Sequence, residues 1–169
     1  LRGLETELGL PPDCARMGVF ASPKGGGLQV HYDTHDIFSI QLKGSKRYNI
    51  APVKEIRFPY GTQFGNEQSV FDDMYPQVQE GFPDWNNADY ETIDMQPGSF
   101  LYMPRGTWHY TEATDEESLS ISIGFKAPSA VDSMLELLRS SLLQDEAWRR
   151  PLYGIWGKAD ARKDAVDRA

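Results

Sequence analysis

The sequence lacks several features that define other classes of protein. A single cysteine, Cys14, occurs in 169 residues, so no disulfide can form within the chain. Such low cysteine use is typical of a reducing compartment. No apolar run approaches the roughly 20 residues that a membrane-spanning helix requires. We therefore expect a cytoplasmic protein without a membrane partner.

Basic charge is also scarce, because 17 Lys and Arg stand against 25 Asp and Glu, a formal net charge of −8. Binding to a phosphate backbone depends on clustered basic side chains that release counterions. No such cluster is visible, and we expect no nucleic-acid partner. The length and a hydrophobic fraction of 40% predict one folded domain. The first residue, Leu1, is not an initiator Met, which suggests that further residues precede it.

The residues up to 128 are typical of an all-β domain. Short alternating apolar runs are separated by Gly and Pro, as in a sandwich or barrel. Within this domain, residues 52–90 are expected to form a lid or rim insertion. Lys43-Gly44-Ser45 and Arg105-Gly106 are expected to be hairpin turns. The expected strands are Met17–Ser22, Gln29–Asp33, Ile37–Leu42, Lys46–Ala51, Glu91–Met95, Phe100–Met103, Thr107–Ala113 and Leu119–Lys126.

After Pro128 the hydrophobic period changes from two to about 3.6, which predicts a helix. Ser129 followed by Asp132 resembles a capping box at its start. The helical region, residues 129–150, is expected to pack on the outside of the domain or to form a homodimer interface. Residues 151–169 are expected to be a tail. The apolar face consists of Val131, Met134, Leu135, Leu138 and Leu142.

The chain contains only three histidines, His31, His35 and His109. His31 and Asp33 are two residues apart on a predicted strand, so their side chains share a face. His109 lies on a later predicted strand. Two imidazoles and one carboxylate can occupy one face of an octahedral metal and leave three positions open for substrate and dioxygen. The alternative is a hydrogen-bonded sheet histidine and a separate surface pair.

Longer segments around these residues resemble the Jumonji-C (JmjC) type cupin oxygenases, including the bacterial ribosomal-oxygenase branch and cupin-like hydroxylases. The run HYDTHDIFSIQLKGSKRY (31–48) is similar to the family's first metal-binding segment, and PGSFLYMPRGTWH (97–109) to its second. The run SLSISIGFKAP (118–128) resembles the closing strand. The resemblance implies a double-stranded β-helix, or jelly roll, that binds Fe(II) and 2-oxoglutarate. It implies that His31, Asp33 and His109 are the iron ligands.

The resemblance also implies that Lys46 pairs with the distal carboxylate of 2-oxoglutarate. The alternation agrees, because Lys46, Tyr48 and Ile50 share a strand face and would be buried together. A buried ammonium needs an anionic partner, which a dicarboxylate would supply. The alternative is that Lys43, Lys46 and Arg47 are solvated charges at a turn.

The predicted closing strand has one small, polar face and one apolar face. In an ordinary sandwich the small face would meet water, whereas in a cupin it can border the cavity, with Ser120 and Ser122 as candidate contacts to the cosubstrate. His35 is expected to line the same pocket or to orient Asp33. Trp108 points away from the His109 face and is expected to pack rather than react.

These features lead us to expect an Fe(II)- and 2-oxoglutarate-dependent oxygenase. It would hydroxylate a C–H bond of a protein, a peptide or an amino-acid-like small molecule, with succinate and CO2 as co-products. The acidic composition favours a basic substrate residue. Two alternatives stay open: a metal-binding cupin enzyme that does not use 2-oxoglutarate, and a non-catalytic cupin binding module.

Overall fold

The computed structural model describes residues 1–51, 56–59, 61–65, 89–115 and 117–151. It divides into two units, residues 1–127 and 128–169, and each is described by itself. Most of the expected insertion at 52–90 and nearly all of the expected tail at 151–169 lie outside the described residues. Those two assignments stay predictions.

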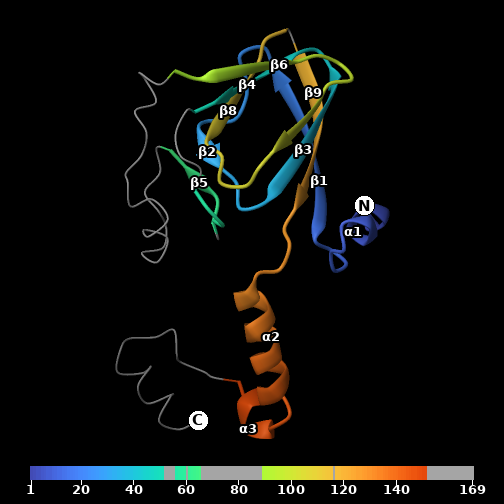
Figure 1. The fold of residues 1–169 in the computed structure, drawn as a ribbon, viewed down its shortest axis with the longest axis vertical. Coiled ribbons are helices and arrows are strands. Elements are labelled where there is room, and N and C mark those ends of the chain that lie inside the picture. Colours follow the sequence, from blue (N-terminus) through green and yellow to red (C-terminus); the bar gives the residue numbers. More distant parts are fainter. Residues whose placement is uncertain (52–55, 60, 66–88, 116, 152–169) are drawn as a thin grey trace. The chain divides into compact units, whose positions relative to one another are not determined.

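The first unit contains two antiparallel sheets that face each other (Figure 1). The four-stranded sheet has the order β1-β9-β3-β7, and the five-stranded sheet has the order β5-β2-β8-β4-β6. Consecutive strands mostly lie in opposite sheets, which is the arrangement of a jelly roll. After helix α1 (Arg2–Glu7), the strands are β1 (Ala15–Pro23), β2 (His31–Tyr32), β3 (Asp36–Lys43), β4 (Lys46–Ile50), β5 (Gln63–Phe64), β6 (Glu91–Met95), β7 (Phe100–Met103), β8 (His109–Ala113) and β9 (Glu117–Phe125).

The alternation along β9 determines which of its faces lies between the sheets. Ser118 and Ser120 are buried, whereas Ile121 and Ile123 on the opposite face are partly exposed. The small face therefore points inward, which is the outcome expected for a cupin and not for an ordinary sandwich. Small side chains at these positions leave space between the two sheets rather than filling it.

The expected strands are present, β6 and β7 with the expected bounds and the others with shifted ones, but the two expected hairpins are wrong. β3 and β4 flank Gly44 and lie in different sheets, as do β7 and β8 on either side of Arg105-Gly106. Each turn therefore carries the chain from one layer to the other. Local turn chemistry cannot distinguish these two outcomes, because the partner of each strand is set by residues far away in the sequence.

Polar side chains make up much of the interior of the first unit. One apolar cluster contains Tyr48, Met95 and Met103, and a second contains Tyr32 and Trp108, whose rings meet edge to face with centroids 4.7 Å apart. The buried polar residues include Ser39, Gln41, Lys46, His31, His109, Thr111 and Ser120. Buried polar groups require partners, so this interior is typical of a binding site rather than of a purely apolar core.

The second unit begins with α2 (Ala130–Leu142), followed by α3 (Glu146–Arg149). The capping box is present: the Asp132 amide donates to Ser129 Oγ at 3.2 Å, and the Ser129 amide donates to Asp132 Oδ2 at 2.8 Å. The apolar face of α2 is exposed in this unit. Its packing against the domain or a second copy stays a prediction. No helix among the described residues is long and apolar enough to cross a membrane.

Gly44 lies at a point of close backbone approach, which generates a stability prediction. Its φ is +62°, and a Cβ there would overlap the carbonyl oxygen of Glu117. Gly44→Ala should lower the free energy of unfolding by about 2 kcal/mol or more in urea denaturation.

Gly25→Ala is the matched control, because its φ is +73° but nothing lies within 4 Å of the added Cβ. This variant should lose only about 1 kcal/mol, the cost of the backbone conformation alone. Equal losses in the two variants would contradict the role of the contact with Glu117.

Candidate metal centre

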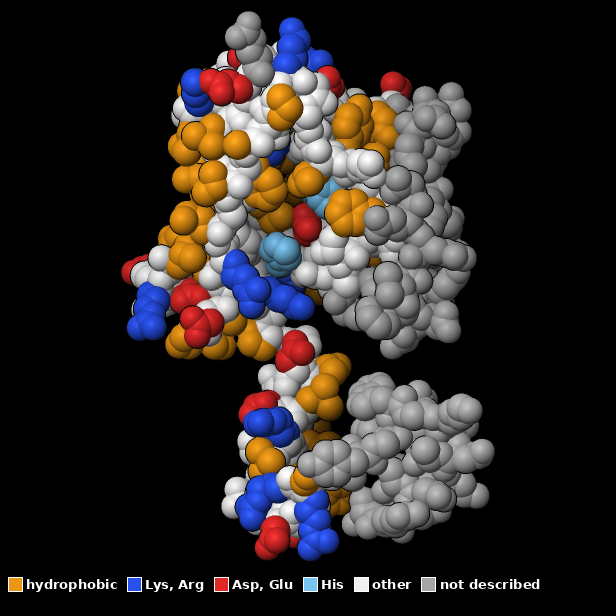
Figure 2. Space-filling view, turned by 180° about the vertical axis from the view of Figure 1, so that it is seen from behind, with side chains coloured by type: hydrophobic (Ala, Val, Ile, Leu, Met, Phe, Trp, Pro, Cys, Tyr) orange, Lys and Arg blue, Asp and Glu red, His pale blue; other side chains and the backbone are white. Residues whose placement is uncertain are grey.

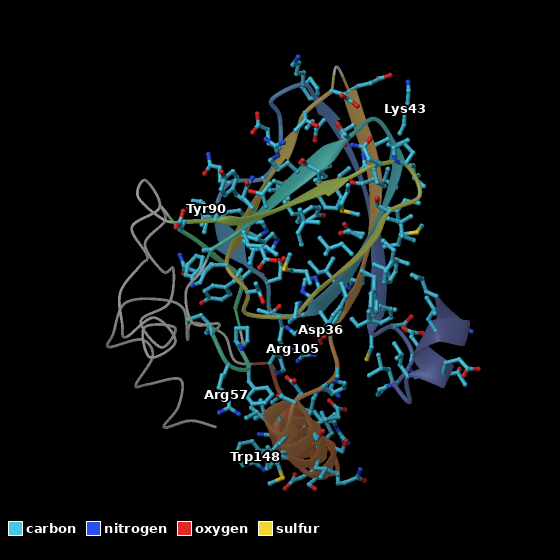
Figure 3. The ribbon with its side chains drawn as sticks, turned by 45° about the horizontal axis from the view of Figure 1, so that its top comes forward. Asp36, Lys43, Arg57, Tyr90, Arg105 and Trp148 are labelled. Atoms are coloured by element: carbon cyan, nitrogen blue, oxygen red, sulfur yellow. The ribbon has the colours of Figure 1, made fainter. Side chains whose placement is uncertain are left out.

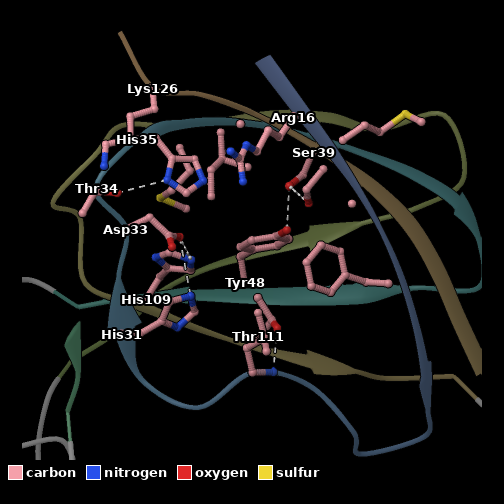
Figure 4. A pocket seen from close by; sticks show the side chains of 18 of the residues that line it. Arg16, His31, Asp33, Thr34, His35, Ser39, Tyr48, His109, Thr111 and Lys126 are labelled. Carbon is pink, nitrogen blue, oxygen red and sulfur yellow. Dashed lines mark hydrogen bonds and ion pairs between the residues drawn. The ribbon is translucent and has the colours of Figure 1, made fainter. Parts of the chain in front are cut away.

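Three side chains converge where β2 and β8 meet. His31 and His109 are directly opposite each other in this antiparallel pair, and Asp33 follows β2 immediately. Asp33 Oδ2 lies 3.6 Å from His31 Nε2 and 4.0 Å from His109 Nε2. One ligand atom from each residue lies within 4.8 Å of the others (Figure 4). The structure thus brings together the three residues that the sequence singles out as ligands.

Backbone carbonyl groups orient both imidazole rings. His31 Nδ1 lies 2.6 Å from the Gln29 carbonyl oxygen, and His109 Nδ1 lies 2.9 Å from that of Thr107. A carbonyl can only accept, so each Nδ1 carries the proton. This arrangement leaves the lone pair of each Nε2 directed toward Asp33. Such orientation by hydrogen bonds is typical of histidines that ligate metals.

The electrostatics of the cluster suit a divalent cation. Burial lowers the pKa of His109 to about 4, and His31 adds to this effect, so His109 is neutral at pH 7. Burial alone would raise the pKa of Asp33, but interaction with His31 and the other imidazoles brings it below its usual value. Two imidazoles and a carboxylate with open positions are the donor set of non-haem Fe(II) sites. The residues present therefore fit the metal.

A second group of contacts joins the two ligand-bearing segments. Asp36 accepts hydrogen bonds from Arg105 Nε at 2.9 Å, from the Arg105 amide at 3.2 Å and from the Tyr102 hydroxyl at 3.0 Å. Figure 3 shows Asp36 and Arg105 side by side. The Gly106 amide donates to the Asp33 carbonyl oxygen at 2.9 Å. The turn before His109 is therefore tied to the segment that carries Asp33. Sequence reasoning missed this pair, because nothing local links residues so far apart.

A cavity of about 660 Å³ extends from this cluster between the two sheets. Figure 2 shows its opening as a hollow in the surface, with histidine and acidic side chains inside. Lys46 lines the cavity and is only 5% exposed. Its Nζ lies 3.5 Å from Ser120 Oγ and 5.1 Å from the centroid of the Phe20 ring. Among the described residues no carboxylate lies within ion-pair distance of Lys46, and burial lowers the pKa of this amine.

The two predicted serines have different surroundings. Ser120 is fully buried and its Oγ accepts a hydrogen bond from Lys46 Nζ, whereas Ser122 lines the cavity and its Oγ lies 3.1 Å from Ser39 Oγ. Ser39 also accepts a hydrogen bond from the Tyr48 hydroxyl at 2.8 Å. Sequence reasoning did not select Tyr48 as a site residue, although its shared face with Lys46 could have revealed it.

His35 lines the same cavity without joining the cluster of three. Its Nδ1 lies 3.3 Å from Thr34 Oγ1, and its ring lies against Gly124 so closely that a Cβ there would overlap it. Of the two roles expected for His35, lining the pocket is the one that these contacts describe.

Comparison with known proteins places the chain in a family. Residues 13–133 match the model of the JmjC domain, and the chain therefore belongs to the JmjC domain family. Its fold is the jelly roll of the cupins. The chain is similar to the X-ray structure of Escherichia coli ycfD, with a TM-score of 0.56 and 20% identity, over 98% of this chain and 42% of that one. That likeness concerns the fold alone.

Curated relatives share more of the sequence. The chain is 31% identical over 148 residues to the uncharacterized protein YxbC of Bacillus subtilis, covering 86% of this chain and 44% of that protein. It is 31% identical over 130 residues to the probable ribosomal oxygenase of Haemophilus influenzae, covering 75% and 28%. The chain thus spans less than half the length of these relatives.

The contacts of Asp36 with Arg105 predict energetic coupling between the two ligand segments. In a double-mutant cycle with Asp36→Asn and Arg105→Gln, we expect a coupling free energy of about 1–3 kcal/mol, because the pair is multiply hydrogen-bonded and partly buried. The measurement is urea denaturation of the metal-free protein.

The Arg47–Asp94 pair serves as the control cycle. It also makes two hydrogen bonds, at 2.7 and 3.1 Å, but its side chains are 41% and 50% exposed. Its coupling should be much smaller than that of the Asp36–Arg105 pair, because solvent screens the attraction between exposed charges. Similar coupling free energies in both cycles would contradict the prediction that Asp36 and Arg105 couple the two ligand segments.

The low pKa of His109 predicts acid sensitivity of the metal-free protein. Because its pKa falls from 6.5 to about 4 on folding, the unfolded chain binds the proton more tightly. The contribution of His109 to the free energy of unfolding is therefore fully present above pH 6.5. It is lost as the pH falls toward 4, by up to about 3 kcal/mol. Urea denaturation at several pH values measures the loss, which the substitution His109→Asn should reduce. If the stability of the wild type and the variant depends on pH in the same way, the low pKa of His109 is not the cause of the acid sensitivity.

Proposed function

We propose that this chain is the catalytic domain of an Fe(II)- and 2-oxoglutarate-dependent oxygenase that hydroxylates a C–H bond, with succinate and CO2 as co-products. The observation that carries the proposal is the placement of two features in one cavity: the cluster of His31, Asp33 and His109, and a buried Lys46 without a carboxylate partner among the described residues. A ligand with a chelating end and an anionic end fits both features.

Each residue of the cavity has a definable task under this proposal. His31, Asp33 and His109 would hold the iron, which supplies the redox chemistry that activates dioxygen. Lys46 would pair with the distal carboxylate of 2-oxoglutarate while it donates a hydrogen bond to Ser120 Oγ. The protein's contribution is to hold these groups in fixed geometry and to shield them from bulk water.

The substrate is proposed to be a residue of a protein or peptide, or an amino-acid-like small molecule. Relatives of this chain include a probable ribosomal oxygenase and lysine-specific demethylase 8 of Xenopus tropicalis, 30% identical over 111 residues. These names support an oxygenase that acts on a macromolecule. The chain covers only 24–28% of those two proteins, so their substrates do not transfer directly.

Removing the charge of Lys46 tests the dependence on 2-oxoglutarate. Lys46→Ala should weaken 2-oxoglutarate binding to the Mn(II)-loaded protein by roughly thirtyfold or more, since a buried charge-assisted pair would be lost. Calorimetry measures the affinity for 2-oxoglutarate, and a parallel titration measures Mn(II), whose affinity should change little. Asp33→Ala should instead abolish Mn(II) binding.

Lys43→Ala is the matched control, because Lys43 is exposed and pairs with Glu117 at the surface. It should leave both affinities unchanged. If wild-type protein binds Mn(II) but not 2-oxoglutarate, the metal-binding cupin that does not use this cosubstrate becomes the better assignment. If Lys46→Ala binds 2-oxoglutarate as wild type does, the role of Lys46 is wrong.

A further inference from the structure

The mouth of the cavity carries more positive charge than the proposed iron and cosubstrate require. Arg16 on β1 and Lys126 just after β9 both line the cavity. Neither makes an ion pair with any residue that the structure describes. Figure 4 shows Arg16 directed into the cavity, on the same side as His35 and Lys126.

The register of β1 and β9 explains how these cations come together. Arg16 is directly opposite Gly124, and the Lys126 amide donates to the Cys14 carbonyl oxygen at 3.0 Å. Because side chains alternate along a strand, the side chains of Arg16 and Lys126 project toward the cavity, on the face of the sheet where a side chain at Gly124 would lie. The absence of a side chain at Gly124 lets the His35 ring lie between them.

The charges of the cavity can be assigned one by one. Asp33 would be neutralised by the metal, and Lys46 by the distal carboxylate of the cosubstrate. The acidic residue that remains among those lining the cavity is Asp13, against the two cations Arg16 and Lys126. The mouth is therefore cationic although the whole chain has a net charge of −8.

We infer that Arg16 and Lys126, with His35 between them, bind a carboxylate of the substrate, so that the oxygenase acts on an acidic residue or an acidic amino acid. This inference rests on the proposed function. A guanidinium presents paired donors that match the two oxygens of a carboxylate, and a second cation beside it adds to the attraction. A basic substrate would meet like charge at the mouth, contrary to what the overall composition favours.

The test uses the protein loaded with Mn(II) and 2-oxoglutarate under anaerobic conditions. Three degenerate peptide libraries of equal length, centred on Glu, Gln or Lys, serve as probes, and free L-glutamate and L-glutamine form a separate arm. In at least one arm, we expect wild-type protein to bind the probe that contains Glu roughly tenfold more tightly than the matching probe that contains Gln. The arm that shows the preference distinguishes a peptide from a free amino acid.

Variants at the mouth of the cavity distinguish the effect of charge on probe binding from the effect of side-chain shape. Arg16→Gln combined with Lys126→Gln should abolish the preference, whereas Arg16→Lys, which keeps the charge, should retain most of it. Lys24→Gln removes an exposed charge that does not line the cavity and is the matched control. Absence of a preference for the acidic probes in wild type, or its persistence in the double variant, would overturn the inference.

The affinity for 2-oxoglutarate, measured in the same samples, keeps the two proposals distinct. Failure of wild type to bind 2-oxoglutarate would overturn the proposed function itself. Normal 2-oxoglutarate binding without any preference for the acidic probes would overturn only the inference about the substrate. A large loss of 2-oxoglutarate affinity in Arg16→Gln would mean that Arg16 binds the cosubstrate instead of the substrate. That result would also overturn the inference about the substrate.

Discussion

The antiparallel pairing of β2 with β8 is the interaction on which the rest of the site depends. It places His31 opposite His109, and their side chains leave the sheet on one face with ring centroids 4.4 Å apart. β2 has only two residues, so this ladder is short. The bond from the Gly106 amide to the Asp33 carbonyl and the contacts between Arg105 and Asp36 extend it beyond the strands. A short ladder held by these cross-connections gives the three side chains a fixed geometry.

The space between the sheets shows how the fold combines stability with a cavity. Small side chains on β9 leave room, and the polar groups that remain bond to one another, as Tyr48 does to Ser39 and Ser39 to Ser122. Lys46 carries a charge as well, and aromatic rings and one hydroxyl surround it, but no carboxylate among the described residues pairs with it. A buried ammonium in this setting costs free energy that a bound anion would recover, which is the physical link between the fold and the proposed chemistry.

Charge has to be considered locally in this protein. The excess of acidic residues describes the chain as a whole and led us to expect a basic substrate. The structure gathers Arg16 and Lys126 at the cavity, and they come from opposite ends of the first unit's sequence. Fields at a partly enclosed opening depend on the few charges nearest to it, since solvent and salt screen the more distant ones. Net charge therefore says little about what such a cavity accepts.

Sequence patterns by themselves determined most of the strands, the alternation of small and apolar side chains along β9, the shared face of Lys46 and Tyr48, and the capping box at Ser129, because each depends on residues close together in the chain. The tertiary structure decided which strands pair. It turned two expected hairpins into connections between sheets, added β5 and α1, joined Asp36 to Arg105 and brought Arg16 to the cavity. These features arise from contacts between residues distant in sequence, and neither propensity nor alternation encodes such contacts.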